Sequence, residues 1–219
     1  MKCFVLNGWA ASAEAWDLCR FPRERVFSYV EELDQLHRQA ISETDAAIVV
    51  GWSMGASMAL SLAMDFPGKV KGLVLLAPTP RMMEDKADGW RGMSPRRLDA
   101  LRRGLELTGG QGFFGIPEGG VNPYMMDDAA NLERGLDYMR STDLRPRLEE
   151  NREALGAIPV SIFQSRRDGI VRLETAHYLK RILPDCVLTE IDGTEHALPV
   201  AIPGLVDRAV FEMMGKNEN

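Results

Sequence analysis

Short apolar runs alternate with amphipathic segments along most of the chain. Runs of strand length that are rich in β-branched residues predict strands at 2–6, 25–30, 46–51, 71–77, 159–164 and 187–191. Apolar residues at helical spacing predict helices at 13–18, 31–42, 54–66, 174–183 and 202–214. Such alternation is typical of a parallel sheet covered by helices on both faces. We therefore predict a single α/β domain over residues 1–219, with a mostly parallel sheet of about six strands.

The interval between Pro78 and Pro159 breaks this alternation. It contains no convincing strand run and is rich in proline and glycine, although 96–107 and 129–140 have helical spacing. We expect a helical cap insertion at about 80–157, after the fourth strand. The alternative is a small helical domain of its own, without a part in the chemistry.

Composition and charge restrict the class of protein. The 219 residues fit one α/β domain, and a net charge of −6 argues against general nucleic-acid binding. No apolar run approaches the ~20 residues of a membrane span, and the first residues lack the pattern of a signal peptide. Three cysteines without a Cys-x-x-Cys pair suggest reduced thiols. We expect a cytoplasmic monomer without nucleic-acid or membrane partners.

The segment Gly51-Trp52-Ser53-Met54-Gly55 has the pattern Gly-x-Ser-x-Gly. It follows the apolar run 46–50 and precedes small apolar residues at helical spacing. Strand, sharp turn and helix together are typical of a nucleophile elbow, in which Ser53 is the nucleophile. The alternative is an ordinary loop with flanking glycines.

A serine nucleophile needs a base, and the chain has three histidines. His196 lies in the loop that follows the last predicted strand, so it shares the carboxyl edge of the sheet with Ser53. We interpret His37 as a solvated residue of a charged helix and His177 as a structural residue of an amphipathic helix. His196 is therefore the predicted base.

Asp168 is the predicted acid that orients His196, because it follows the strand 159–164. The chain order Ser53, Asp168, His196 is the order of the α/β-hydrolases. Asp192 and Glu195 are rival acids, and Asp168-Gly169 could instead be a surface turn.

Two backbone N–H groups are predicted to stabilise a tetrahedral oxyanion. One belongs to Met54, directly after the nucleophile, and the other to Trp9, in the glycine-containing loop after the first strand. The Trp9 ring could line an acyl pocket or be a core residue. Zinc-ligand, dinucleotide and Walker patterns are missing, so we expect neither metal nor cofactor.

These motifs resemble the α/β-hydrolase fold family over nearly the whole chain. Within it, the chain is most similar to the carboxylesterases of biotin synthesis that act on pimeloyl-[acyl-carrier protein] methyl ester. The resemblance rests on Asn7-Gly8-Trp9 with Trp16, the elbow 51–55, Ser141-Thr142-Asp143-Leu144-Arg145 and Asp168-Gly169-Ile170-Val171. Two departures stand out: Asn7 replaces the family's histidine, and 29–33 replaces its Asp-x-Pro-Gly-x-Gly stretch.

The predicted cap contains a local excess of arginine. Arg96, Arg97, Arg102 and Arg103 could contact an acidic carrier protein, or they could form a solvated helix face with ion pairs. Methionines of the same segment could line an acyl tunnel or belong to its core. They are Met82, Met83, Met93, Met125, Met126 and Met139.

Together these features predict a serine carboxylesterase that hydrolyses an acyl ester. The resemblance favours methyl pimeloyl-carrier protein as the substrate. The alternatives are a general small-molecule carboxylesterase or thioesterase, and a non-catalytic ligand-binding protein with the same fold.

Overall fold

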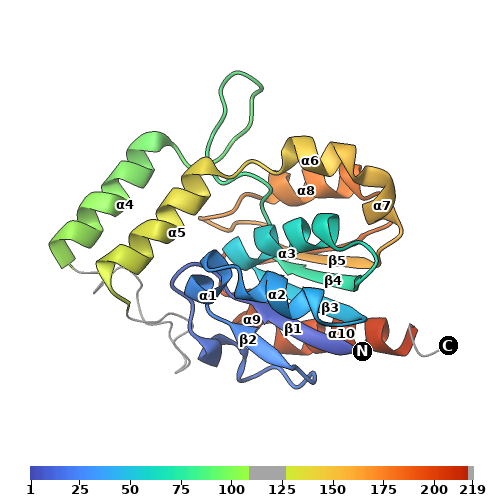
Figure 1. Cartoon of the computed structure of the whole chain (residues 1–219). Helices are drawn as coiled ribbons and strands as arrows, with labels where there is room; N and C mark the ends of the chain where they lie inside the picture. Colours follow the sequence, from blue (N-terminus) through green and yellow to red (C-terminus); the bar gives the residue numbers. More distant parts are fainter. Residues whose placement is uncertain (109–126, 217–219) are drawn as a thin grey trace.

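A six-stranded, wholly parallel sheet forms the centre of the molecule (Figure 1). The computed structural model describes residues 1–108 and 127–216. The strand order is β2-β1-β3-β4-β5-β6. The strands are β1 (Lys2–Leu6), β2 (Arg25–Phe27), β3 (Ala47–Trp52), β4 (Val70–Leu76), β5 (Val160–Ser165) and β6 (Val187–Ile191). The prediction of a mostly parallel α/β sheet of about six strands is confirmed.

Helices cover both faces of this sheet (Figure 1). On one face, α3 (Met54–Asp65) packs on the central strands and α8 (Leu173–Ile182) packs on β5 and β6. On the other face, α10 (Pro203–Lys216) contacts β3 and β4, next to the short α9 (Leu198–Ala201). A parallel sheet needs this double cover because its strands are apolar on both sides, and every residue of β3 is buried.

The interval between β4 and β5 carries helices and no strand within its described part. The helices are α4 (Pro95–Thr108), α5 (Ala129–Ser141), α6 (Arg145–Glu150) and α7 (Arg152–Gly156). The pair α4 and α5 lies side by side beyond the carboxyl ends of the strands, whereas α6 and α7 lie over the sheet (Figure 1). The interpretation of this interval as a cap stays a prediction.

The predicted strand 25–30 and helix 31–42 are differently divided in the structure. A 3-10 helix, η1 (Ala13–Trp16), precedes β2, which ends at Phe27. Two helices, α1 (Tyr29–Leu33) and α2 (Leu36–Ser42), then flank Gln35, which has a left-handed backbone with φ of 66°. At about 100° per residue, one continuous helix would point Glu32 and His37 about 140° apart. The break lets both side chains turn inward.

His37 is consequently buried, and its interpretation as a solvated residue was wrong. Its side chain is 3% exposed and packs edge-on against the Phe27 ring. Burial, with a smaller effect of Arg38, lowers the pKa of His37 to about 4. The imidazole is thus neutral in the folded protein at neutral pH.

We expect the contribution of His37 to the free energy of unfolding to fall as the pH is lowered from 6.5 to 4. The unfolded chain takes up a proton at His37 near pH 6.5, whereas the folded chain resists protonation down to about pH 4. At ~1.4 kcal/mol per pKa unit, the loss approaches roughly 3 kcal/mol. Urea unfolding of wild type and His37→Leu at pH 7.0, 5.5 and 4.5 measures it. A difference between the two proteins that does not change with pH would contradict the prediction.

Within the described residues, none of the helices combines the length and apolar character needed to cross a membrane.

Candidate active site

The carboxyl ends of four strands meet at one edge of the sheet. Ser53 follows β3, Asp168 follows β5 and His196 follows β6. The loop that begins with Asn7-Gly8-Trp9 follows β1, the neighbour of β3. Segments far apart in the sequence therefore converge because parallel strands all end on the same side.

Ser53 occupies a strained turn between β3 and α3. Its φ of 55° and ψ of −116° are unusual for a residue with a side chain. A Cβ at Gly51 would lie 2.6 Å from the carbonyl oxygen of Gly55, and a Cβ at Gly55 would lie 2.4 Å from that of Leu6. Only glycine allows these approaches. The turn places Ser53 at the N-terminus of α3, which favours negative charge nearby.

His196 lies between Ser53 and Asp168. Its Nε2 is 3.0 Å from the Ser53 Oγ, and its Nδ1 is 2.7 Å from Asp168 Oδ2. The Asp168 carboxylate is fully buried, and the imidazole is 10% exposed. These contacts bring together the three side chains that the sequence singled out, in the geometry that a base and its orienting acid require.

The rival acids lie elsewhere. Asp192 is exposed and pairs with Arg167, and the exposed Glu195 accepts a hydrogen bond from Ser165 only through its backbone carbonyl. Asp168 is itself held in place: its Oδ1 accepts hydrogen bonds from the N–H groups of Ile170 and Val171, at 2.7 and 3.1 Å.

Two further side chains that the sequence analysis did not identify support this arrangement. The Gln164 amide donates to Asp168 Oδ2 at 3.3 Å and to the Val171 carbonyl at 3.0 Å. The Trp52 indole donates to the His196 carbonyl at 2.8 Å, and the two rings are 5.9 Å apart. Trp52 stands inside the elbow motif, but nothing in the sequence indicates that its indole reaches the histidine loop.

The loop after β1 packs directly against the elbow. A Cβ at Gly8 would lie 3.3 Å from Cβ of Ser53 and 3.4 Å from the Trp52 carbonyl oxygen. Met54 is the first residue of α3, so its N–H lacks an acceptor one turn earlier in the helix. The Trp9 indole donates to the Leu132 carbonyl of α5 at 2.9 Å, which ties the loop to that helix.

An apolar pocket of about 220 Å³ opens beside the Ser53 hydroxyl. Aromatic, methionine and aliphatic side chains form most of its wall, and α4 and α5 contribute to it. The lining residues are Gly8, Trp9, Trp52, Ser53, Met82, Met93, Arg97, Leu101, Met139, Ile170 and His196. Met83 is buried outside this lining, and Met125 and Met126 lie outside the described residues.

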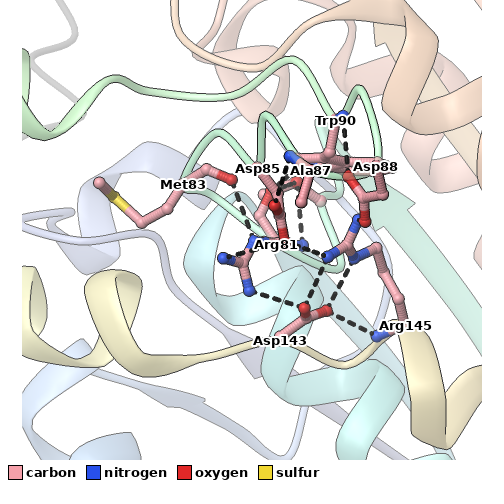
Figure 2. Close-up of polar contacts among 9 residues, drawn as sticks. Arg81, Met83, Asp85, Ala87, Asp88, Trp90, Asp143 and Arg145 are labelled. Atoms are coloured by element: carbon pink, nitrogen blue, oxygen red, sulfur yellow. Dashed lines mark hydrogen bonds and ion pairs between the residues drawn. The ribbon is translucent and has the colours of Figure 1, made fainter.

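A charged cluster fixes the loop that carries Met82 and Met93 (Figure 2). Asp143 accepts from Arg81 at 2.6 Å and from Arg145 at 2.8 Å. Arg145 also pairs with Asp85 and Asp88 of this loop, and its guanidinium lies over the Trp90 ring at 5.0 Å. The cluster thereby anchors the pocket wall to the segment that leads into α6.

The four arginines of α4 have different surroundings. Arg102 pairs with Glu133 and Asp137 of α5. Arg97 lines the pocket and donates to the Gly169 carbonyl at 3.3 Å. Arg96 and Arg103 are exposed, and they form no ion pair with another described residue. Among the described ion pairs, therefore, only Arg102 of these four arginines is joined to a second helix.

Metal-binding side chains are not clustered in the part of the chain that the structure describes. No group of three or more histidine, cysteine, aspartate or glutamate side chains there could hold an ion. The exposed His177 contacts Glu190 of β6 at 2.9 Å, and β6 lies three strands away from β3, which precedes Ser53.

Comparisons with known proteins agree with this architecture. Residues 7–115 match the family model described as alpha/beta hydrolase fold. The pimeloyl-[acyl-carrier protein] methyl ester esterase of Methylococcus capsulatus is 33% identical over 168 residues, which are 67% of this chain and 62% of that protein. The enzyme of the same name from Yersinia enterocolitica is 23% identical over 95% of this chain and 91% of that protein.

Solved structures share the fold. An esterase from Exiguobacterium antarcticum superposes with a TM-score of 0.74 at 16% identity, over 98% of this chain and 92% of that one. We therefore assign the chain to the α/β-hydrolase fold family. This fold defines the class of the α/β-hydrolases. Several proteins that resemble it in sequence are named pimeloyl-[acyl-carrier protein] methyl ester esterase.

Proposed function

We propose that this protein is a serine carboxylesterase in which Ser53 is the nucleophile, His196 the base and Asp168 the orienting acid. One observation carries the proposal: a continuous path from Asp168 through His196 to Ser53, at 2.7 and 3.0 Å, ends beside an apolar pocket. A neutral imidazole that donates Nδ1–H to Asp168 presents the Nε2 lone pair to the serine hydroxyl.

In the proposed reaction, Ser53 Oγ attacks the ester carbonyl carbon while its proton passes to His196 Nε2. The N–H groups of Trp9 and Met54 stabilise the oxyanion of the tetrahedral intermediate. This intermediate collapses, and the leaving alkoxide takes the proton from His196 and departs as an alcohol. Water, deprotonated by His196, then attacks the acyl-enzyme, releasing the acid and restoring Ser53.

For the substrate, we propose methyl pimeloyl-carrier protein, which would give pimeloyl-carrier protein and methanol. The names of the relatives and the apolar pocket support this choice. The exposed Arg96 and Arg103 add a basic surface on α4, next to Arg97 at the pocket. Carrier proteins are acidic, so this surface has the complementary charge.

Hydrolysis of methyl pimeloyl-carrier protein and of p-nitrophenyl butyrate by wild type and Ser53→Ala tests the proposal. A strong preference for the carrier substrate that disappears in Ser53→Ala would support both parts. Serine-dependent turnover of the small ester alone would leave a general esterase and contradict the carrier substrate. If neither is hydrolysed, labelling by a fluorophosphonate decides whether Ser53 is reactive or the protein only binds ligands.

Charge reversal at Arg96 and Arg103 is expected to separate docking from chemistry. In Arg96→Glu/Arg103→Glu, kcat/KM for the carrier substrate should fall about tenfold or more at low salt, and less at high salt, because screening weakens the attraction. Turnover of p-nitrophenyl butyrate should stay within about twofold. Arg20→Glu/Arg208→Glu changes the net charge equally at exposed arginines outside α4 and the pocket. Equal losses in both double variants would contradict docking through α4.

A further inference from the structure

A carboxyl group lies buried behind the loop that follows β1. Glu32, the last residue but one of α1, is 0% exposed. Its neighbour Glu31 faces the other way, completes the capping box with Ser28 and pairs with Arg25. Of these two neighbours, Glu31 belongs to the helix cap and Glu32 lies in the interior. The cap therefore explains the role of Glu31 but not the burial of Glu32.

Glu32 contacts the backbone of this loop at its first residue. Its Oε1 accepts a hydrogen bond from the Asn7 N–H at 2.5 Å. The Asn7 side chain, which is also buried, accepts a hydrogen bond from the Trp16 indole at 2.6 Å. Asn7 is therefore held through both its backbone and its side chain, immediately before Gly8 and Trp9.

The loop has little freedom to adopt another position. A Cβ at Gly55 would lie 2.5 Å from the Asn7 carbonyl oxygen, so this peptide already touches the elbow helix. A Cβ at Gly135 would lie 2.2 Å from the Trp9 ring, which packs equally closely on α5. Between these contacts, the orientation of the peptides from Asn7 to Trp9 depends on what holds the Asn7 N–H.

No cation balances this carboxyl group within the described residues. Burial raises the pKa of Glu32 well above its usual range; the Asn7 N–H opposes this shift, and Glu31 adds to it. Tyr138 of α5 is close enough to interact with Glu32, and its phenol is uncharged at neutral pH because burial raises its pKa further above the usual range. The second carboxyl oxygen, Oε2, has no hydrogen-bond partner in the described part of the chain. A neutral side chain such as glutamine can therefore replace the group.

We infer that Glu32 is a positioning residue of the oxyanion site: it holds Asn7 so that the Trp9 N–H faces the charge that develops on the Ser53 adduct. The inference rests on the proposed serine mechanism for its kinetic consequence. Removal of a whole oxyanion donor costs about 10²- to 10³-fold in kcat, so misorientation of one donor should cost about 10- to 100-fold.

The test compares Glu32→Gln, which keeps an acceptor for the Asn7 N–H, with Glu32→Leu, which has none. We expect Glu32→Leu to lower kcat for p-nitrophenyl butyrate about 10- to 100-fold with KM within about threefold, because the interaction acts in the transition state. Glu32→Gln should restore kcat to within about threefold of wild type. Glu31→Gln, which weakens the cap of the same helix without contacting Asn7, should leave kcat unchanged. If Glu32→Leu does not fold, Glu32→Asp, which withdraws the carboxyl by one methylene, replaces it.

Amide hydrogen exchange in the peptide that covers Asn7 to Trp9 provides a readout independent of turnover. Exchange should be faster in Glu32→Leu than in wild type, and unchanged in Glu32→Gln. Unchanged exchange and kcat in Glu32→Leu would overturn the inference while leaving a Ser53-dependent activity intact. Absence of Ser53-dependent turnover in wild type would instead refute the proposed function, and hydrogen exchange alone would then decide whether Glu32 positions the loop.

Discussion

Replacement of Ser53 by alanine is expected to lower kcat for ester hydrolysis by about 10⁴- to 10⁶-fold. The variant loses the oxygen that forms the acyl-enzyme, so only water attacking an oriented ester remains. The pocket wall and the backbone N–H groups of Trp9 and Met54 are unaffected, so KM should change little. The measurement is initial rates under saturating substrate, with enough enzyme to detect the residual rate.

Ser61→Ala is the matched control for this substitution. Ser61 lies on the same helix, α3, but its hydroxyl contacts Asp65 and Arg147 instead of the site. We expect its kcat within about twofold of wild type, with a loss of stability of ~1 kcal/mol at most. Turnover that persists in Ser53→Ala at more than a few per cent of wild type would rule out the serine mechanism.

Asp168→Asn is expected to lower kcat by about 10⁴-fold without unfolding the protein. The N–H groups of Ile170 and Val171 both point at one oxygen of residue 168, at 2.7 and 3.1 Å. The amide of an asparagine must therefore place its oxygen there and its NH₂ group toward His196. An NH₂ group at that position favours the tautomer with the proton on Nε2, which cannot accept the proton of Ser53.

Asp192→Asn makes the same chemical change at a rival acid. Asp192 pairs with Arg167 at the surface, so we expect kcat within about twofold of wild type. Thermal unfolding of both variants separates loss of activity from loss of fold. A larger loss of kcat in Asp192→Asn than in Asp168→Asn would show that our proposal assigns the orienting role to the wrong carboxylate.

The local sequence was sufficient to predict the sheet and the convergence of three side chains at one of its edges. Strands and helices are encoded by apolar periodicity over a few neighbouring residues, and a parallel sheet gathers the loops after its strands at one edge. Ser53, Asp168 and His196 each lie in the segment that follows a predicted strand, so their convergence needed no knowledge of distant packing.

Burial of polar groups could not be predicted in this way. His37 and Glu32 lie in a segment rich in charged residues, and this composition predicts a solvated helix. In the structure, the break at Gln35 turns both side chains inward. Whether a charged residue is buried depends on the element that packs against it, here the loop after β1 and the Phe27 ring.

The sequence by itself determined the parallel α/β architecture, the strained serine between two glycines and the chain order of the proposed nucleophile, acid and base. The tertiary structure alone decided which carboxylate meets His196, which arginines of α4 remain unpaired within the described residues, and which groups hold the loop beside Ser53. The physical reason is the range of the interactions: periodicity and turn chemistry act between neighbours in the chain, whereas hydrogen bonds and ion pairs such as Glu32 to Asn7 join residues that only the completed fold brings together.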